Sequence, residues 1–405
     1  MDDANTVGAR LRVLRKWRRL SQQQVADLAG LSQAHLSKIE RGLWPLDRRS
    51  HIAGLANALK VSETDIVGGP HLSDDPVQSD PHVGIPALQV ALETNSLRAP
   101  TIDRARPLAD ITRDLARLEP VRMAADYIHL GRQLPDIIDE LHFHVADPED
   151  EAAYQLALET LVEACMAASA LAGNLGYRDV AYIAASRGYE AAAILDNPIQ
   201  HGKAEFMRIL NLPRAGTWSR TLIAAERAAN ELQPHATKSL DVQVLGMLAL
   251  TASLAAASVH KQAAANQWLS EAEELARRVP DDPVGNWERF SATNVSVWRV
   301  TIGVELGESG GRILEKAQAV NASKLNRTSS RKAAFLADAG RGLAREPRTG
   351  DQAVRWLREA EKLAPQRIRN NARVRETVSA LLTQSLAGAG GVELRGMAAR
   401  MGVPH

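Results

Sequence analysis

The stretch LSQQQVADLAGLSQAHLSKIERG, residues 20–42, decides the fold of the N-terminal part of the chain. Ser21 is a favourable N-cap, because its side chain can accept hydrogen bonds from the free backbone N–H groups of a helix that begins at Gln22. Gly30 ends that helix, since glycine tolerates the left-handed backbone of a tight turn. Ser32 then caps a second helix. The stretch therefore predicts two short helices joined by a fixed turn.

The apolar positions predict which faces of these two helices are buried. Helical spacing places Val25, Leu28 and Ala29 on one face of the first helix. The second helix buries Leu36 and Ile39 in the same way. The side chains that remain face outward from the second helix, and they are Gln33, Ala34, Ser37 and Lys38.

The stretch resembles the Xre family of helix-turn-helix regulators. Family landmarks occur along the whole N-terminal segment, and they include Gly8, Leu11, Arg12, Leu14, Arg15, Ser21, Gln22, Ala26, Gly30, Leu31, Ser32, Leu36, Ser37, Ile39, Glu40, Arg41 and Gly42. The resemblance implies a five-helix, lambda-repressor-like DNA-binding domain. Its expected helices cover residues 7–19, 22–29, 33–41, 48–59 and 63–67. A helical hairpin inside a larger bundle is the structural alternative.

Length and charge indicate a second, different domain. At 405 residues the chain is too long for one core. Residues 1–66 hold 11 Lys and Arg against 7 Asp and Glu, whereas the remainder holds 38 against 41. A small basic domain on a larger, nearly neutral one fits a DNA reader joined to something that does not bind DNA. No signal peptide or long apolar span is recognised in the sequence, which predicts a cytoplasmic protein without membrane contact.

We expect three segments: residues 1–67 as the helix-turn-helix domain, 68–84 as a linker rich in Gly, Pro, Ser and Asp, and 85–405 as an entirely helical domain. The segment GDQAVRWLREAEKLAP, residues 350–365, matches the second half of a tetratricopeptide (TPR) repeat. The predicted fold is therefore all-α, with a C-terminal TPR-like α-solenoid; an irregular helical bundle is the alternative. This part also resembles the TPR half of actinobacterial Xre-type regulators. Cys165 is expected to be a small buried apolar residue.

The candidate DNA-binding residues follow from side-chain chemistry and from the family resemblance. They are Gln22, Ser32, Gln33, Ala34, His35, Ser37, Lys38, Arg48 and Arg49. Gln33 lies at the leading edge of the second helix, where a carboxamide can pair with adenine. The family pattern implies that Gln22 binds phosphate. Arg48 and Arg49 either flank the DNA backbone or are solvated surface charges.

The family resemblance also implies an internal ion pair between Arg15 and Glu40. One such domain reads only a few base pairs, so we expect a homodimer on a palindromic operator in double-stranded DNA.

No catalytic motif is recognised, so we expect no enzyme activity, no cofactor and no metal. A TPR-like surface suits a peptide or protein ligand. The candidate ligand residues are Trp287, Phe290, Asn294 and Trp298, which recur at three- and four-residue spacing and continue through Thr301 and Glu305. The alternative is that Phe290 and Trp298 pack between helices. Three functions compete: a regulator that senses a ligand, a regulator whose helical domain only dimerises or binds a partner protein, and an enzyme or scaffold that merely uses DNA tethering. The absence of catalytic motifs argues against the third.

Overall fold

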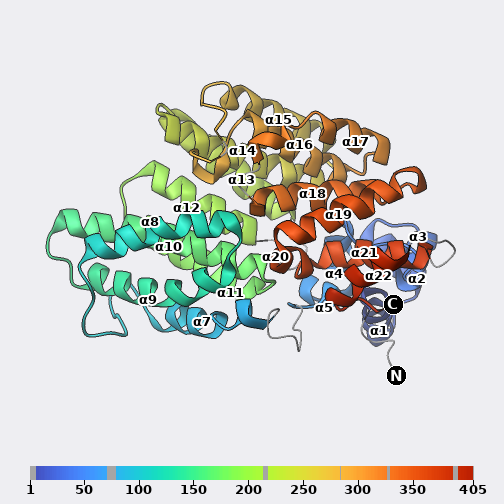
Figure 1. Cartoon of the computed structure of the whole chain (residues 1–405), viewed down its shortest axis with the longest axis horizontal. Coiled ribbons are helices and arrows are strands. Elements are labelled where there is room, and N and C mark those ends of the chain that lie inside the picture. Colours follow the sequence, from blue (N-terminus) through green and yellow to red (C-terminus); the bar gives the residue numbers. More distant parts are fainter. Residues whose placement is uncertain are drawn as a thin grey trace.

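The computed structural model describes residues 6–70, 79–212, 218–282, 284–325, 329–385 and 391–404. Within these ranges the regular structure is helical and no strand occurs, apart from one isolated β-bridge between Ser96 and Ala99. The predicted all-α fold class is confirmed (Figure 1).

The first five helices form a small domain with its own core. They are α1 (Val7–Trp17), α2 (Gln22–Ala29), α3 (Gln33–Glu40), α4 (Arg49–Leu59) and α5 (Glu63–Val67). The core is built from apolar residues of every helix, including Leu11, Val25, Leu36, Leu55 and Ile66, each with no exposed surface. The helix bounds agree with the sequence expectation to within two residues.

The rest of the chain is an array of longer helices. They are α7 (Ile85–Thr94), α8 (Leu108–Ala124), α9 (Tyr127–Ala146), α10 (Glu151–Asn174), α11 (Arg178–Ala192), α12 (Pro198–Asn211), α13 (Trp218–Leu232), α14 (Ser239–Ser258), α15 (Gln262–Ala276), α16 (Ala292–Leu306), α17 (Gly310–Gln318), α18 (Ser329–Leu343), α19 (Gly350–Leu363), α20 (Pro365–Arg369), α21 (Ala372–Ser385) and α22 (Gly391–Arg400). Short 3₁₀ turns connect several of them, namely η2 (Asp80–His82), η3 (Gln233–His235), η4 (Trp287–Arg289), η5 (Ala322–Leu325) and η6 (Pro347–Thr349).

Consecutive helices of the array pack as hairpins, most extensively α10 with α11, α14 with α15, and α18 with α19. Small residues allow the close approach. A Cβ atom added at Gly340 would lie 2.8 Å from Leu357, and Ala353 and Ala360 are completely buried. This is the packing that the segment at residues 350–365 predicts, and stacked hairpins of this kind make an α-solenoid. Cys165 is buried, also as predicted.

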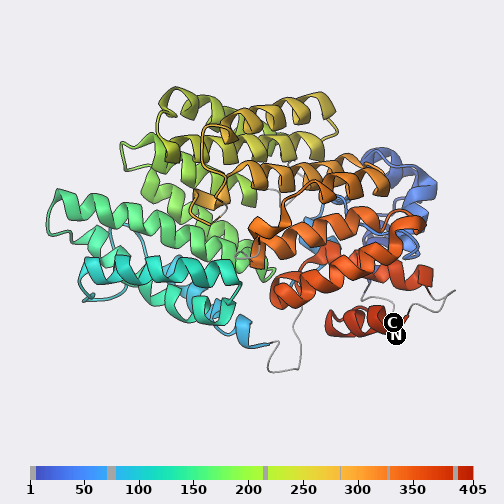
Figure 2. The ribbon, with the colours of Figure 1, turned by 45° about the horizontal axis from the view of Figure 1, so that its top comes forward.

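The array is curved. In Figures 1 and 2 the chain runs from α7–α11 through α13–α17 to α18–α22, and α18 returns to pack against α8. The N-terminal domain lies at the far end of the array, beside α21 and α22 (Figure 1). A helix from the first third of the array, α8, therefore contacts a helix from its last third, α18.

Two array helices correct the expectation that the chain has no long apolar span. By length and composition α10 and α14 could cross a membrane, but 72% and 94% of their apolar windows are buried inside the protein. These helices form the centre of the packed array, which explains their composition.

Part of the predicted linker at residues 68–84 is packed. His82 is buried, with its Nδ1 atom 3.0 Å from the hydroxyl of Tyr177. Gly84 lies so close to Gly131 that a Cβ atom would come within 2.5 Å of a backbone carbonyl. Residues 71–78 lie outside the described part of the chain.

Candidate functional site

The turn between α2 and α3 has the caps that the sequence predicts. The Ser21 hydroxyl accepts from the backbone N–H of Gln24, whose side chain accepts in return from the backbone N–H of Ser21. This reciprocal pair is a capping box. Gly30 ends α2 in the left-handed region at φ 69°, and Ser32 caps α3 by accepting from the His35 N–H. Local chemistry thus sets the angle between the two helices.

One face of α2 differs from the prediction. Val25 and Ala26 are fully buried, whereas Leu28 is 64% exposed. Leu28 therefore does not belong to the apolar face as expected, and Ala26 occupies the buried position instead. The sequence spacing alone did not separate these positions, because the helix is only two turns long.

The predicted ion pair between Arg15 and Glu40 is confirmed. Two parallel hydrogen bonds join them, Nε to Oε1 at 2.6 Å and Nη2 to Oε2 at 2.9 Å. The Glu40 side chain has no exposed surface. Burial opposes its ionisation, but hydrogen bonds from Arg15 and Gln22 outweigh that effect and lower the pKa of Glu40. The pair holds α1 against α3.

A chain of carboxamides extends from this ion pair to the protein surface. The Gln22 amide donates to Glu40 Oε2 at 2.8 Å, and its carbonyl oxygen accepts from the Gln33 amide at 2.8 Å. Gln33 itself is exposed at the first position of α3. Its side chain is therefore oriented by the protein while its own carbonyl oxygen and second N–H face solvent. The carbonyl oxygen can accept from adenine N6, and the N–H can donate to adenine N7.

The other predicted residues of α3 divide into two groups. Ala34 and Lys38 are exposed beside Gln33, and Ser37 is partly exposed. His35 instead turns into the domain, where its ring meets the edge of His51 at 5.1 Å and that of Trp44 at 5.7 Å between centroids. Because His35 is only half-buried, its place among the DNA-binding residues stays a prediction.

The structure also corrects the prediction for Arg48 and Arg49. Both residues contact the helical array at the carboxyl end of α16. Arg48 Nη2 donates to the backbone oxygen of Glu305 at 2.8 Å, and the Arg49 backbone N–H donates to the Glu305 carboxylate at 2.8 Å. The Arg49 guanidinium forms an ion pair with the same carboxylate. These arginines therefore join the two domains instead of flanking DNA.

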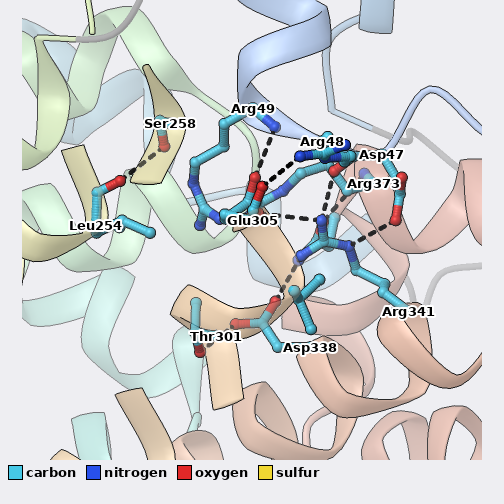
Figure 3. Close-up of polar contacts among 12 residues, drawn as sticks. Asp47, Arg48, Arg49, Leu254, Ser258, Thr301, Glu305, Asp338, Arg341 and Arg373 are labelled. Carbon is cyan, nitrogen blue, oxygen red and sulfur yellow. Dashed lines mark hydrogen bonds and ion pairs between the residues drawn. The ribbon is translucent and has the colours of Figure 1, made fainter. Parts of the chain in front are cut away.

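Glu305 is the centre of a buried ionic cluster at the junction (Figure 3). Its side chain has no exposed surface, and Arg341, also fully buried, lies 3.2 Å from it. Arg341 bonds the backbone oxygen of Asp47 in the N-terminal domain and pairs with Asp338 at 2.7 Å. Burial opposes the ionisation of Glu305, yet the arginines around it, Arg49 first, lower its pKa well below the usual range. The cluster fixes the N-terminal domain on the array and leaves the leading edge of α3 exposed.

The four predicted ligand residues do not share one helix face. Helix α16 begins at Ala292, so Trp287 and Phe290 precede it. Phe290 is fully buried against α14, where a Cβ atom at Gly246 would overlap its ring. The prediction that Phe290 touches a ligand is therefore wrong, and inter-helix packing is the correct alternative for this residue.

The remaining three residues line cavities at the centre of the array. Asn294 and Trp298 line a cavity of about 270 Å³. Trp287 lines an adjoining cavity of about 750 Å³, and the two share Arg122, Met166 and Glu288. Four arginines line the smaller cavity, and sequence reasoning missed them because they come from distant helices: Arg122, Arg289, Arg331 and Arg367.

Comparison with known proteins identifies the N-terminal domain. Residues 6–66 match the helix-turn-helix domain family. The chain therefore carries a helix-turn-helix domain, the class of domain found in DNA-binding transcriptional regulators. No curated protein sequence matches the chain. Among solved structures, PlcR of Bacillus thuringiensis in complex with the peptide PapR7 and DNA shares 14% identity at a TM-score of 0.26, covering 68% of this chain and 95% of PlcR.

Proposed function

We propose that the chain is a sequence-specific transcriptional regulator that reads double-stranded DNA with α3. The observation that carries the proposal is the Gln33 carboxamide, which is held by Gln22 and exposed at the start of the helix. A side chain that is already oriented loses less entropy when it binds a base. Ala34 and Lys38 extend the same exposed edge, and Ser37 adds a hydroxyl. The N-terminus of α2, capped by Ser21, offers backbone N–H groups to a phosphate.

The proposal includes membership of the Xre family, of the actinobacterial type, and a cytoplasmic location. Gly8, one of the family landmarks, supports the family assignment. A Cβ atom there would lie 2.5 Å from the backbone oxygen of Ile39 and 2.9 Å from that of Glu40. Only glycine therefore lets α1 cross the end of α3 at this distance.

We also propose that the regulator acts as a homodimer on a palindromic operator. A single helix-turn-helix domain contacts few base pairs, and two copies on half-sites about 34 Å apart supply the missing affinity. Because the ionic cluster around Glu305 fixes each reader on its array, the array sets where the reader points. The arrangement of two arrays would then set the spacing of the two readers.

The array is proposed to sense a ligand, and a peptide is the class we favour. Asn294 and Trp298 line the smaller central cavity and Trp287 the adjoining larger one. Asn294 is buried, and its side-chain oxygen accepts from Arg331 Nε at 2.8 Å, so a peptide backbone that used this asparagine as donor and acceptor would replace that bond. Aromatic side chains would provide apolar contact. An array that only dimerises or binds a partner protein is the alternative, and it requires no ligand in these cavities.

Helix α16 provides a physical connection between cavity and reader. Asn294 and Trp298 lie on the cavity, and Glu305 binds the N-terminal domain on the same helix. Glu305 follows Asn294 by eleven positions, which corresponds to about 16 Å along the helix. A ligand changes DNA affinity only if it binds one arrangement better than another, and a tenfold change needs about 1.4 kcal/mol of such coupling.

Selection of operators from random DNA tests the reading function. The full-length protein should enrich one palindromic sequence. Gln33→Ala should relax the preference at one position in each half-site, while Gln89→Ala, an exposed glutamine on α7, should leave the enriched sequence unchanged. A full-length protein that enriches no sequence would contradict the proposal, and so would a Gln33→Ala profile identical to that of the wild type.

Sedimentation of the protein with the selected operator tests the dimer. We expect two copies on one palindrome and weak binding to a single half-site. A monomer that binds one half-site as tightly as the whole operator would rule out the dimeric mechanism.

A further inference from the structure

The smaller central cavity, which we call the arginine pocket, lies where distant parts of the array meet. Its arginines come from α8, η4, α18 and α20, and they are Arg122, Arg289, Arg331 and Arg367. Its apolar wall comes mainly from α10, α12, α14 and α16, and includes Met166, Phe206, Met207, Leu210, Met247 and Trp298. One side of the pocket is thus cationic and the other is apolar.

The positive charge of the arginine pocket exceeds its negative charge. Arg122 forms ion pairs with Glu119 at 2.6 Å and Glu288 at 2.8 Å. Arg289 lies farther from the same two carboxylates, at 3.9 and 3.6 Å. The carboxylates of Glu119 and Glu288 therefore form ion pairs with only two of the four arginines, Arg122 and Arg289.

Arg331 and Arg367 have only neutral hydrogen-bond partners in the part of the chain that the structure describes. Arg331 Nε donates to the side-chain oxygen of Asn294 at 2.8 Å, and Arg367 donates to the backbone oxygen of Ser330 at 3.2 Å. Neither forms an ion pair with a described carboxylate. Asp338 and Glu288 attract Arg331 from beyond ion-pair distance, but Arg367 and Arg289 oppose them. Both arginines are partly buried beside other positive charges, so this excess favours a bound anion.

Three N–H donors at the arginine pocket are buried without a hydrogen-bond partner among the described residues. They are Nε of Arg289, Nη2 of Arg331 and Nε1 of Trp298. The Arg289 side chain is only 9% exposed. Each group is a donor with no acceptor function, so a bound molecule must bring acceptors to satisfy them.

The turn that carries Arg289 is strained. Glu288 and Arg289 both have left-handed backbones, with φ of 44° and 64°. Such a conformation is unfavourable for a residue that is not glycine, because the Cβ atom approaches the backbone. The ion pairs with α8 hold this turn in place, and strain of this kind is concentrated at binding sites.

We propose that the arginine pocket binds the carboxylate or phosphate group of a ligand, with Arg331, Arg289 and Arg367 as its donors. The planar fork of a guanidinium matches both anions. The apolar part of the ligand lies against Met207 and Trp298 and extends toward the larger cavity. This inference rests on the proposed sensing role of the array and names the chemistry of its ligand.

The electrostatics of Arg331 agree with this assignment. Burial and the nearby charge of Arg367 lower the pKa of Arg331 to about 9. A bound anion would stabilise the protonated form and reverse this shift. Arg331 also lies over the ring of Trp298, with its guanidinium carbon 5.6 Å from the ring centre, so a ligand on Arg331 changes the surroundings of that indole.

Calorimetric titration of the full-length protein, in a buffer without other carboxylates or phosphates, tests the site. The probes are N-acetyl-leucine, its uncharged amide N-acetyl-leucinamide, and inorganic phosphate. We expect one equivalent of N-acetyl-leucine or phosphate to bind, and the amide to bind at least about tenfold more weakly. Tighter binding of N-acetyl-leucine indicates a carboxylate with an apolar group, as at a peptide C-terminus, and tighter binding of phosphate indicates a phosphorylated ligand.

Variants locate the site. Arg331→Met should weaken anion binding at least about tenfold, and Arg331→Lys should keep part of it, because charge remains but the fork is lost. Arg299→Met is the matched control, since Arg299 lies on α16 with its side chain bound to Glu273 outside the pocket. Binding of the anion should also change the tryptophan fluorescence, and Trp298→Phe should remove that change.

The inference is overturned if neither anion binds at millimolar concentration, if the amide binds as tightly as the acid, or if Arg331→Met and Arg331→Lys bind the anions like the wild type. Operator binding, measured on the same samples, separates this result from the proposed function. Loss of anion binding with intact operator selection refutes only the ligand chemistry, whereas anion binding without operator selection refutes the regulator.

Discussion

Replacing Glu305 with glutamine should release the N-terminal domain from the array. The wild-type carboxylate is fully buried and accepts from the backbone and the guanidinium of Arg49. It also lies 3.2 Å from Arg341 and 3.6 Å from Arg373. Glutamine has nearly the same shape but no charge, so Arg49 loses its carboxylate partner and Arg341 keeps only Asp338 and Asp47.

The expected cost is large because the partners stay buried. Breaking a buried ion pair from one side typically costs about 3–5 kcal/mol, since the remaining charge is left without compensation. Applied to the contact between the two domains, this cost shifts the equilibrium toward the separated arrangement about a hundredfold or more.

Hydrogen exchange and small-angle scattering measure this release. The amides in the first turn of α4, beginning with Arg49, should exchange faster in Glu305→Gln, and the radius of gyration should increase. Glu361→Gln is the control, because Glu361 is also buried between two arginines, Arg369 and Arg400, but lies within the array. It should lower the free energy of unfolding of the array without changing exchange in α4.

Acid should reproduce the effect in the wild type. The pKa of Glu305 is lower in the folded protein than in the unfolded chain, so its contribution to stability is complete above about pH 4.3 and declines as the pH falls below that value. Glu305→Gln should lack this part of the acid dependence. Unchanged α4 exchange and an unchanged radius of gyration in Glu305→Gln would refute the reasoning that this cluster holds the domains together.

Three further predictions concern single residues. Gln33→Ala should cost about 1–3 kcal/mol of discrimination at one operator position. Gln22→Ala removes the support of Gln33 and the phosphate contact that the family pattern implies, so it should also weaken binding to every sequence; competition binding with single-base operator variants separates the two. Glu40→Ala should lower the free energy of unfolding of the N-terminal domain by about 3–5 kcal/mol, because it leaves Arg15 without its carboxylate. Hydrogen exchange in α1 and α3 measures this change. An unchanged exchange pattern with weakened DNA binding would mean that Glu40 acts at the DNA. Burial raises the pKa of Glu376 to about 7, so the folded state holds this proton more tightly than the unfolded chain does. The stability of the wild type should therefore fall as the pH rises from about 4.3 to 7. The melting temperature of Glu376→Gln should not show this fall, and parallel curves of melting temperature against pH for the two proteins would contradict the prediction.

The N-terminal domain was predictable because its signals are local. The caps at Ser21 and Ser32, the turn at Gly30 and the pair of Arg15 with Glu40 all follow from short-range patterns or from the family resemblance, and the structure has each of them. The hairpin packing of residues 350–365 followed from the spacing of small residues in the same way. Leu28 shows the limit of such patterns, because a two-turn helix has too few positions to define its buried face.

By itself, the sequence determined the helices, the helix-turn-helix domain and the exposed position of Gln33, since capping, periodicity and turn chemistry act over a few residues. Only the tertiary structure decided which charges meet. Arg49 and Glu305 are 256 residues apart, and the arginines of the central pocket come from four separate elements. Their meeting depends on the curvature of the array, which sums small rotations over many helix pairs. No local pattern encodes that sum, so the domain junction and the arginine pocket became visible only in the folded chain.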